Sequence, residues 1–219
     1  MYSHILLFGA TGAAGSLFAK FALRKNYKLT IYVRNPGKVD PDIASHKNVT
    51  VITGELSDQS KLLEAVKTGV DSVVLLVGGD MSTKGTPLLD GIKTLYPILI
   101  AQNVKRVIVL STPSYSDPKD KTNLFFWFGV RALWYLARDQ QLQVIGLATH
   151  TISQSLEQLE WTVIRIPMLT NHSAMPVYAG YVGDGRAKSK LSRQSLAQWC
   201  LEELEAKNWV GKAPFLSNK

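Results

Sequence analysis

The sequence contains a single cysteine, Cys200, so no disulfide can form within the 219-residue chain. Its neighbours, SLAQWCLEEL, have helical spacing, and we expect a buried, unreactive thiol. A chain without disulfides is typical of a reducing compartment, and no basic stretch precedes the first apolar run as it would in a secretory signal. We therefore expect a cytoplasmic location.

Long hydrophobic runs and long blocks of one charge are also missing. No stretch reaches the roughly 18 consecutive apolar residues of a membrane-spanning helix. The 25 Lys and Arg exceed the 17 Asp and Glu, giving a formal net charge of +8, but the cations are dispersed along the chain. A dispersed excess favours a small anionic ligand or solubility over a nucleic-acid tail, so we expect no nucleic-acid partner. His4, His46 and His172 have no metal-ligand spacing with any acid pair, and we predict no metal site.

Low-complexity linkers and internal repeats are absent, which favours one domain over residues 1–219. Two patterns alternate instead. Short apolar, β-branched runs occupy residues 4–10, 28–34, 48–56, 71–79, 105–112 and 161–169. Helical spacing occupies residues 13–25, 58–68, 86–103, 123–139, 143–159 and 192–207, the last opening at a capping residue, Ser192. This alternation predicts an α/β fold, a single Rossmann-type domain whose doubly wound parallel sheet is flanked by helices, with loop 170–190 over the carboxyl edge of the sheet.

A glycine-rich stretch, GATGAAG at residues 9–15, follows the first predicted strand and opens the first predicted helix. In this context Gly9 permits a sharp turn, Gly12 lets the backbone approach a pyrophosphate, and Gly15 allows close packing of helix on strand. The free N–H groups and the dipole at a helix N-terminus favour phosphate charge. The stretch therefore predicts a dinucleotide site.

Arg34 ends the second predicted strand, at the position where an NAD site usually carries Asp or Glu to bind the ribose hydroxyls. Lys38 follows four residues later, with no carboxylate between them. Two cations favour the additional 2′-phosphate of NADP(H), which we predict as the cofactor. The alternative interpretation is an arginine that covers the adenine ring without selecting the nucleotide.

Many Rossmann oxidoreductases place a catalytic Tyr and Lys four residues apart on one helix, so that the lysine lowers the pKa of the tyrosine. The sequence has one literal match, Tyr115 and Lys119. Pro118 lies between them, and Ser-Asp-Pro is typical of a turn, so the two side chains would not share a helix face. We therefore predict an enzyme without this pair.

Three polar residues remain as candidates near the predicted strand ends. Ser111 and Thr112 close the fifth predicted strand, where a doubly wound sheet presents its ligand. His150 lies on a predicted helix, with Gln154 and Gln158 on the same face, and its imidazole is able to donate to the substrate or the cofactor. A solvent-exposed histidine on a helix surface is the alternative.

An aromatic segment, NLFFWFGVRALWYLARD at 123–139, is apolar on almost every side if helical. Four interpretations stay open: a lid over an aromatic substrate, an oligomer contact, peripheral contact with a membrane through 124–136, or ordinary core packing. A lid is preferred because the segment follows the strand end at Ser111 and Thr112. We expect a monomer or a weak homo-oligomer.

These residues resemble the atypical short-chain dehydrogenases/reductases of the NmrA-like group, most closely the biliverdin-IXβ reductase/flavin reductase type. The resemblance runs nearly end to end. It is carried by FGATGAAG, VRNPGK, TGELSD, LLVGG, VIVLST, the His150 segment leading to WTVIRIPML, and GDGRAKSKLSRQSLAQWCLEEL. The closing pattern is more specific than the first, which many Rossmann families share.

The resemblance implies a single Rossmann domain that binds NADPH. The cofactor contacts expected from motif and resemblance together are Gly9, Thr11, Gly12, Ala13, Ala14, Gly15, Arg34, Lys38, Glu55, Leu56, Val77, Gly78, Gly79, Leu110, Ser111, His150 and Met168. Ser111, Thr112 and His150 are the expected catalytic residues, and Thr112, Trp127 and Met168 the expected substrate contacts.

Two departures from that family concern the substrate. Met168 stands where the family often carries histidine, and residues 120–145 exceed the family length by more than a helix, an insertion that holds the aromatic segment. The predicted function is an NADPH-dependent reductase of a planar aromatic or polycyclic molecule, flavin-, tetrapyrrole- or quinone-like. The alternatives are a non-catalytic NADP(H) sensor of the NmrA type and a redox-neutral isomerase or cyclase.

Overall fold

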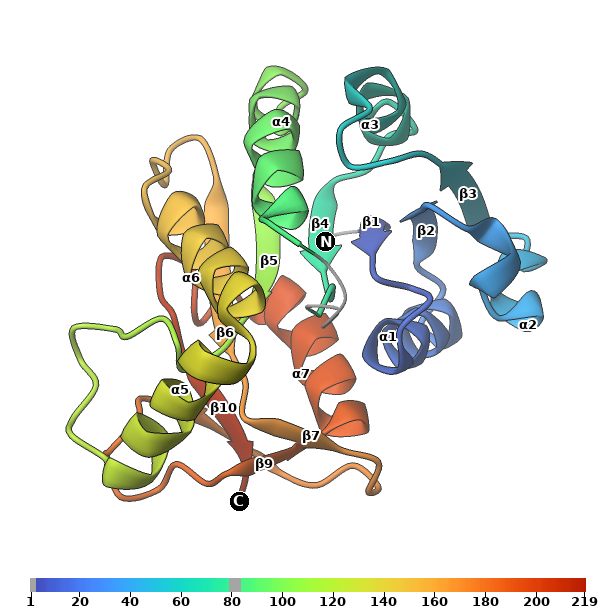
Figure 1. Ribbon diagram of the computed structural model, residues 1–219. Coiled ribbons are helices and arrows are strands. Elements are labelled where there is room, and N and C mark those ends of the chain that lie inside the picture. Colours follow the sequence, from blue (N-terminus) through green and yellow to red (C-terminus); the bar gives the residue numbers. More distant parts are fainter. Residues whose placement is uncertain (1–2, 79–83) are drawn as a thin grey trace.

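A computed structural model describes residues 3–78 and 84–219, which form a twisted central sheet covered by helices on both faces (Figure 1). The sheet order is β3-β2-β1-β4-β5-β6-β10-β8, and β7 and β9 form a separate parallel pair. The strands are β1 His4–Phe8, β2 Lys28–Val33, β3 Val49–Thr53, β4 Ser72–Leu75, β5 Arg106–Ser111, β6 Glu160–Arg165, β7 Met168–Thr170, β8 Val177–Gly180, β9 Lys190–Ser192 and β10 Phe215–Asn218. All pairs in the main sheet are parallel except β10–β8.

The helices form two layers. They are α1 Ala13–Arg24, α2 Pro41–Ala44, α3 Gln59–Val66, α4 Pro87–Ala101, α5 Leu124–Leu136, α6 Arg138–Ile152 and α7 Arg193–Ala206, with a short 3₁₀ turn η1 at Pro36–Lys38. Helices α1 and α7 pack against each other on one face, and α3, α4 and α6 on the other (Figure 1). In β1, Ile5 and Leu7 point into the first layer while Leu6 and Phe8 point into the second, so a continuous apolar run serves both faces.

The predicted fold class is confirmed, and each of the six predicted strands is present. The sequence patterns did not predict β8, β9 and β10, and the single strand predicted over 161–169 is divided into β6 and β7; β7 to β10 are each only three or four residues long. Residues 177–180, expected in a loop, form β8, which lies antiparallel to β10 at the sheet edge. These strands gain their stability from pairing across the fold, which a short run does not reveal by itself.

Helix α6 starts earlier and ends earlier than the predicted 143–159. Its first residues, RDQQ, are polar and lack the apolar spacing that predicts a helix. Gln141 and Gln143 are nevertheless buried, and their side chains form hydrogen bonds with Val130 O and Leu88 N–H. Ser153 caps its C-terminal end, and the following residues form turns. His150 therefore lies in the last turn of the helix.

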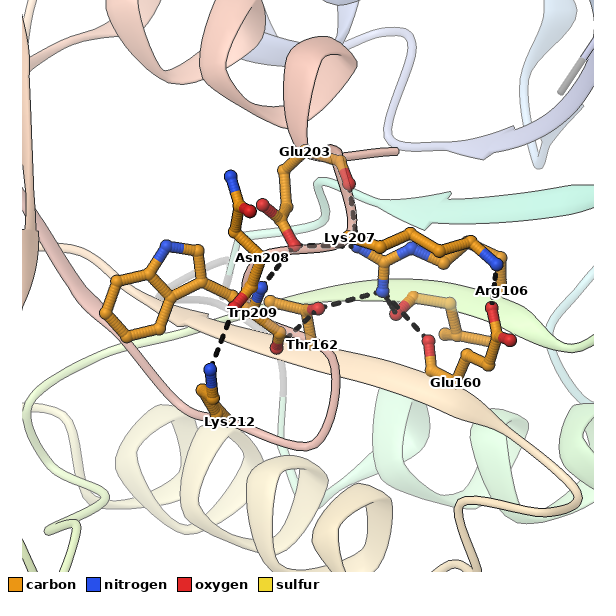
Figure 2. Close-up of polar contacts among 9 residues, drawn as sticks. Arg106, Glu160, Thr162, Glu203, Lys207, Asn208, Trp209 and Lys212 are labelled. Carbon is orange, nitrogen blue, oxygen red and sulfur yellow. Dashed lines mark hydrogen bonds and ion pairs between the residues drawn. The ribbon is translucent and has the colours of Figure 1, made fainter. Parts of the chain in front are cut away.

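A buried ion pair joins β5, β6 and α7 at the amino edge of the strands (Figure 2). Arg106 donates to Glu203 Oε1 at 3.2 Å and to Thr162 Oγ1 at 2.8 Å, and Glu203 Oε1 also accepts from the backbone N–H of Trp209 at 2.8 Å. Burial raises the pKa of Glu203, and the Trp209 N–H and Arg106 oppose that rise. The network stabilises the amino edge of the sheet, opposite the carboxyl edge where the candidate site lies.

Glu203→Ala is expected to destabilise the protein by about 3–5 kcal/mol, because it leaves the Arg106 guanidinium buried without its carboxylate. Glu202→Ala is the matched control, since Glu202 is exposed on the same helix, and it should change stability by less than about 0.5 kcal/mol. Urea unfolding followed by circular dichroism measures both. Equal midpoints for the two variants would contradict a stabilising role for this pair.

Cys200 lies in α7 and is fully buried in the layer formed with α1, as expected. Burial raises the pKa of its thiol, which keeps the sulfur protonated and unreactive at neutral pH. Ser192 caps α7 by accepting from the N–H groups of Gln194 and Ser195, also as expected. Helix α7 is therefore capped at its N-terminus and buried against α1 in its middle.

Candidate functional site

The turn between β1 and α1 is built by two glycines that no other residue replaces easily. Gly9 has φ +89°, and a Cβ there would lie 2.5 Å from the carbonyl oxygen of Leu76. A Cβ on Gly15 would lie 2.1 Å from the carbonyl oxygen of Gly9, so a side chain would push α1 away from β1. The sharp turn and the close helix–strand packing expected of these glycines are both present.

Gly12 is the N-cap of α1 and provides no side-chain cap for the helix. A Cβ at this position would lie 3.4 Å from Gly9 O, so the free protein has room there for a methyl group. Ala13, Ala14 and Gly15 form the first turn, which carries no acidic residue. Their N–H groups and the helix dipole suit an anion, as the glycine pattern predicted.

A hollow of about 340 Å³ opens beside this turn, at the carboxyl ends of β1, β2 and β3. It brings together seven of the residues expected to hold a dinucleotide: Gly9, Thr11, Arg34, Lys38, Glu55, Leu56 and Val77. Phe8, Tyr32, Val33, Asn35 and Gly54 also line it, and sequence reasoning did not include them. The order of β1 and β4 makes this edge the switch point of a doubly wound sheet, where such folds bind ligands.

Arg34 and Lys38 are both exposed at this hollow. In the described ranges, 3–78 and 84–219, neither side chain forms an ion pair with a carboxylate. Asn35 Oδ1 accepts from Gly37 N–H at 3.1 Å, which caps η1 and fixes the turn that carries Lys38. Two uncompensated cations held at a strand end fit a phosphate group.

Tyr32 supports the hollow from beneath. Its hydroxyl donates to the carbonyl of Glu55 at 2.8 Å, and burial raises its pKa to about 12, so it stays protonated. A Cβ on Gly54 would lie 2.3 Å from the Tyr32 hydroxyl, so Gly54 is needed for this contact. The only indication of this contact in the sequence is that Gly54 lies near the end of the strand predicted over 48–56.

A second hollow, of about 420 Å³, lies at the carboxyl ends of β5 and β6. Thr112 and Met168, two of the expected substrate contacts, both line it. The other lining residues are mostly apolar and come largely from α5 and the β6–β7 connection: Pro113, Ser114, Phe125, Phe126, Gly129, Val130, Ile166, Pro167 and Ser189. Thr112 Oγ1 accepts from Ser114 N–H at 3.3 Å, and Met168 is 62% exposed at the surface.

A buried ion pair fixes the segment between Thr112 and α5. The guanidinium of Arg165 is fully buried at the end of β6 and donates to Asp120 Oδ1 at 2.9 Å. The same oxygen accepts from Val182 N–H at 3.0 Å. No local pattern in the sequence indicates this pair, because its members are 45 residues apart. It holds the loop that borders the second hollow.

Trp127 does not line the hollow that contains Thr112 and Met168, so the prediction that these three residues share a substrate pocket is wrong for Trp127. It lines a separate hollow of about 560 Å³ together with Arg131, Trp134 and Tyr135. At 100° per residue, Phe125 and Gly129 lie on one side of α5 and Trp127 on the other.

Ser111 lies too deep for the predicted catalytic role. Its side chain is 1% exposed, and its hydroxyl donates to the carbonyl oxygen of Val144 at 3.0 Å. This hydrogen bond ties the end of β5 to α6. Leu110 likewise packs its side chain into the core, which leaves only its backbone near the strand end.

His150 lies away from this edge, which argues against its predicted catalytic and cofactor roles. Ser111 contacts α6 at Val144, and His150 is six residues further along, about 9 Å towards the amino edge of the strands. Its ring stacks on Tyr96, with centroids 5.6 Å apart. Burial lowers the pKa of the imidazole, and the positive charge of nearby Lys93 lowers it further. The predicted helix boundaries were wrong, and this error put His150 at the strand ends.

Three further expectations concern glycines and turns. Gly78 is exposed after β4, and Gly79 lies outside the described residues. Tyr115 and Lys119 lie in turns rather than on a helix, and the ammonium of Lys119 lies 5.3 Å from the ring centroid of Tyr181. The literal Tyr-x-x-x-Lys match therefore does not have the helical geometry that the catalytic pair requires.

The turn, the two exposed cations and the switch-point hollow together have the arrangement expected of a dinucleotide site. A family model described as NAD(P)H-binding matches residues 9–207. The chain belongs to this NAD(P)H-binding family. The predicted cofactor class is thereby confirmed. The match covers α1 to α7, all of the hollow at Thr112, and all of the dinucleotide hollow except Phe8.

Solved structures resemble this NAD(P)H-binding protein over nearly its whole length. A short-chain dehydrogenase/reductase from Veillonella parvula in complex with NADP has a TM-score of 0.78 at 20% identity, covering 100% of this chain and 95% of the other. An anaerobilin reductase from Escherichia coli O157:H7 has a TM-score of 0.70 at 17% identity, covering 99% and 97%. Likeness at this identity establishes the Rossmann fold.

Curated relatives match over a shorter part of the NAD(P)H-binding chain. A phenylcoumaran benzylic ether reductase from Ginkgo biloba is 32% identical over 97 residues, which is 42% of this chain and 31% of the relative. An isoflavone reductase homologue from Zea mays is 33% identical over 110 residues, 48% of this chain and 33% of the relative. The matches thus span about a third of the length of these relatives.

Proposed function

We propose that the protein is an NADPH-dependent reductase that transfers hydride to a planar aromatic or polycyclic small molecule, flavin-, tetrapyrrole- or quinone-like, without a Tyr–Lys pair. The observation that carries this proposal is Arg34, an exposed guanidinium without a carboxylate partner in the described chain, at the end of β2. A cation there suits a 2′-phosphate, which NADPH has and NADH lacks. The reductases among the similar proteins support the reaction class, and the biliverdin-IXβ reductase type is the finer proposal.

The residues present fit this cofactor. The N–H groups of the first turn of α1 would hold the pyrophosphate, Arg34 and Lys38 the 2′-phosphate, and Leu56 and Val77 would border the adenosine. NADPH, when bound, supplies the hydride that reduces the acceptor. The protein's own contribution is to position the two molecules along the carboxyl edge of the sheet.

The hollow at Thr112 is the proposed acceptor site. Its apolar walls, including Phe125, Val130 and Ile166, suit a planar ring system and exclude water from its faces. The Thr112 hydroxyl already accepts from Ser114 N–H, so its own proton remains to donate to a polar atom of the acceptor. The acceptor would take its second hydrogen, a proton, from water at the mouth, where Met168 is exposed.

Thr112→Val tests this assignment, because valine keeps the shape of threonine and removes the hydroxyl. We expect kcat/KM for the acceptor to fall about tenfold to a hundredfold, the effect of one lost hydrogen bond, with NADPH affinity unchanged. Thr112→Ser is the control and should retain activity. Loss of NADPH absorbance with FMN, menadione and biliverdin provides the assay. Equal activity of all three proteins would remove Thr112 from the site while leaving the reductase proposal intact.

A further inference from the structure

Helix α5 carries most of the large apolar side chains that the described chain exposes. Those on the helix are Leu124, Phe125, Trp127, Phe128, Trp134, Tyr135 and Leu136, and those elsewhere are Leu142, Leu156, Met168 and Met175. Seven of eleven thus lie within one 13-residue helix. Single exposed apolar residues are ordinary on a protein surface, but a cluster of this kind indicates a contact surface.

Among the described residues, the contacts that attach α5 to the rest of the fold lie along one side of the helix. Phe126 packs edge-on against Phe215 with ring centroids 5.1 Å apart, and the carbonyl oxygen of Val130 accepts from Gln141 Nε2 at 3.1 Å. At 100° per residue, Phe128 and Tyr135 lie on the opposite side, where they are 64% and 75% exposed. Core packing, one of the interpretations of the aromatic segment, is therefore wrong, and we call this exposed side the α5 outer face.

The cations beside the α5 outer face are Arg131, on the helix, and Arg138, two residues after it. Residues 124–138 contain no Asp or Glu, and the flanking carboxylates Asp120 and Asp139 accept hydrogen bonds from Arg165 and from the Gly85 N–H. The Arg131 guanidinium lies 5.6 Å from the Trp127 ring centroid, and that of Arg138 lies 4.9 Å from Trp134. Tryptophan, tyrosine and arginine side chains with apolar bodies and polar ends suit the region between lipid headgroups and acyl chains.

We propose that the α5 outer face docks the protein on an anionic lipid bilayer, with α5 lying in the plane of the headgroups. Anionic headgroups complement Arg131 and Arg138, and the aromatic side chains partition into the interface. Within residues 3–78 and 84–219, no helix is long and apolar enough to cross a membrane, and α5 is about 20 Å long.

A second copy of this chain is a poorer occupant of the α5 outer face. A two-fold contact would bring the Arg131 and Arg138 side chains of both copies into one interface. Since residues 124–138 contain no carboxylate, the face itself would not compensate these like charges. The membrane proposal does not depend on the proposed reductase activity and is tested without cofactor or acceptor.

Sedimentation with vesicles provides the test. The wild type should bind vesicles of phosphatidylcholine and phosphatidylglycerol, bind poorly to phosphatidylcholine alone, and be released by salt. Phe128→Ser/Tyr135→Ser should weaken binding about tenfold or more, and the control Leu156→Ser/Met175→Ser, which changes exposed apolar residues off α5, should not. Arg131→Gln and Arg138→Gln should each weaken binding about fivefold.

Tryptophan fluorescence and oligomeric state complete the test. Trp127 and Trp134 are exposed, so a blue shift on adding anionic vesicles is expected. Because the four substituted apolar residues are exposed, unchanged thermal melting will show that both double variants fold. Absence of vesicle binding, or equal binding to neutral and anionic vesicles, overturns the proposal. A concentration-dependent dimer that Phe128→Ser/Tyr135→Ser abolishes, without vesicle binding, would assign the face to a second copy instead.

Discussion

Arg34→Ala is expected to weaken NADPH binding about tenfold to a hundredfold and to leave NADH binding nearly unchanged. The guanidinium is exposed at the dinucleotide hollow and forms no ion pair with a carboxylate in the described part of the chain. A charged hydrogen bond to the 2′-phosphate contributes about 1.5–3 kcal/mol, which corresponds to this loss of affinity. Isothermal titration with each nucleotide measures both affinities in the same buffer.

Arg24→Ala is the matched control for charge, since Arg24 is also exposed but lies at the far end of α1. It should leave both affinities unchanged. Arg34→Asp should go further and reverse the preference, because a carboxylate repels the 2′-phosphate and accepts from the ribose hydroxyls of NADH. Equal losses for NADPH and NADH in Arg34→Ala would show that the arginine only covers the adenine ring.

The second large effect is a contrast between Gly15→Ala and Gly12→Ala, which change two glycines of the same turn. Gly15→Ala is expected to destabilise the fold by about 3 kcal/mol or more, because its Cβ would lie 2.1 Å from the Gly9 carbonyl oxygen. Gly12→Ala should cost at most about 1 kcal/mol, since its Cβ would lie 3.4 Å from the nearest atom of the free protein. A methyl group on Gly12 would nevertheless occupy the space through which a pyrophosphate approaches the backbone, so NADPH binding should fall about a hundredfold or more.

Thermal melting and NADPH titration on both variants measure this contrast. The expected result is a folded Gly12→Ala protein that binds no NADPH at concentrations saturating for the wild type. Gly15→Ala should melt at a temperature lower by about 6 °C or more. A Gly12→Ala protein that binds NADPH as the wild type does would mean that the pyrophosphate lies elsewhere.

The dinucleotide half of the site could be predicted because its determinants are local. Gly9 and Gly15 are fixed by contacts within one strand–turn–helix unit, and Arg34 is placed by the end of a buried strand. Such units keep their geometry whatever surrounds them. The residues missed there, Tyr32 and Gly54, support the hollow through contacts between neighbouring strand ends.

The geometry of the proposed acceptor half could be predicted only in part, because it depends on long-range contacts. Thr112 follows from the strand pattern, but the Arg165–Asp120 pair joins residues 45 positions apart. The start of α6 is polar because Gln141 Nε2 and Gln143 Oε1 form buried hydrogen bonds, so periodicity placed the helix too late and His150 at the wrong end. The exposure of α5 could not be predicted either, because its sequence is apolar on every side and does not indicate which side faces solvent.

NADPH oxidation by purified protein with a panel of planar acceptors tests the central proposal most directly. FMN, menadione and biliverdin represent flavins, quinones and tetrapyrroles, and NADH serves as the second donor. We expect that at least one acceptor is reduced, that NADPH is the preferred donor, and that Arg34→Ala removes the preference. Tight NADPH binding with no oxidation by any acceptor would contradict the reductase proposal and indicate a non-catalytic NADP(H) sensor.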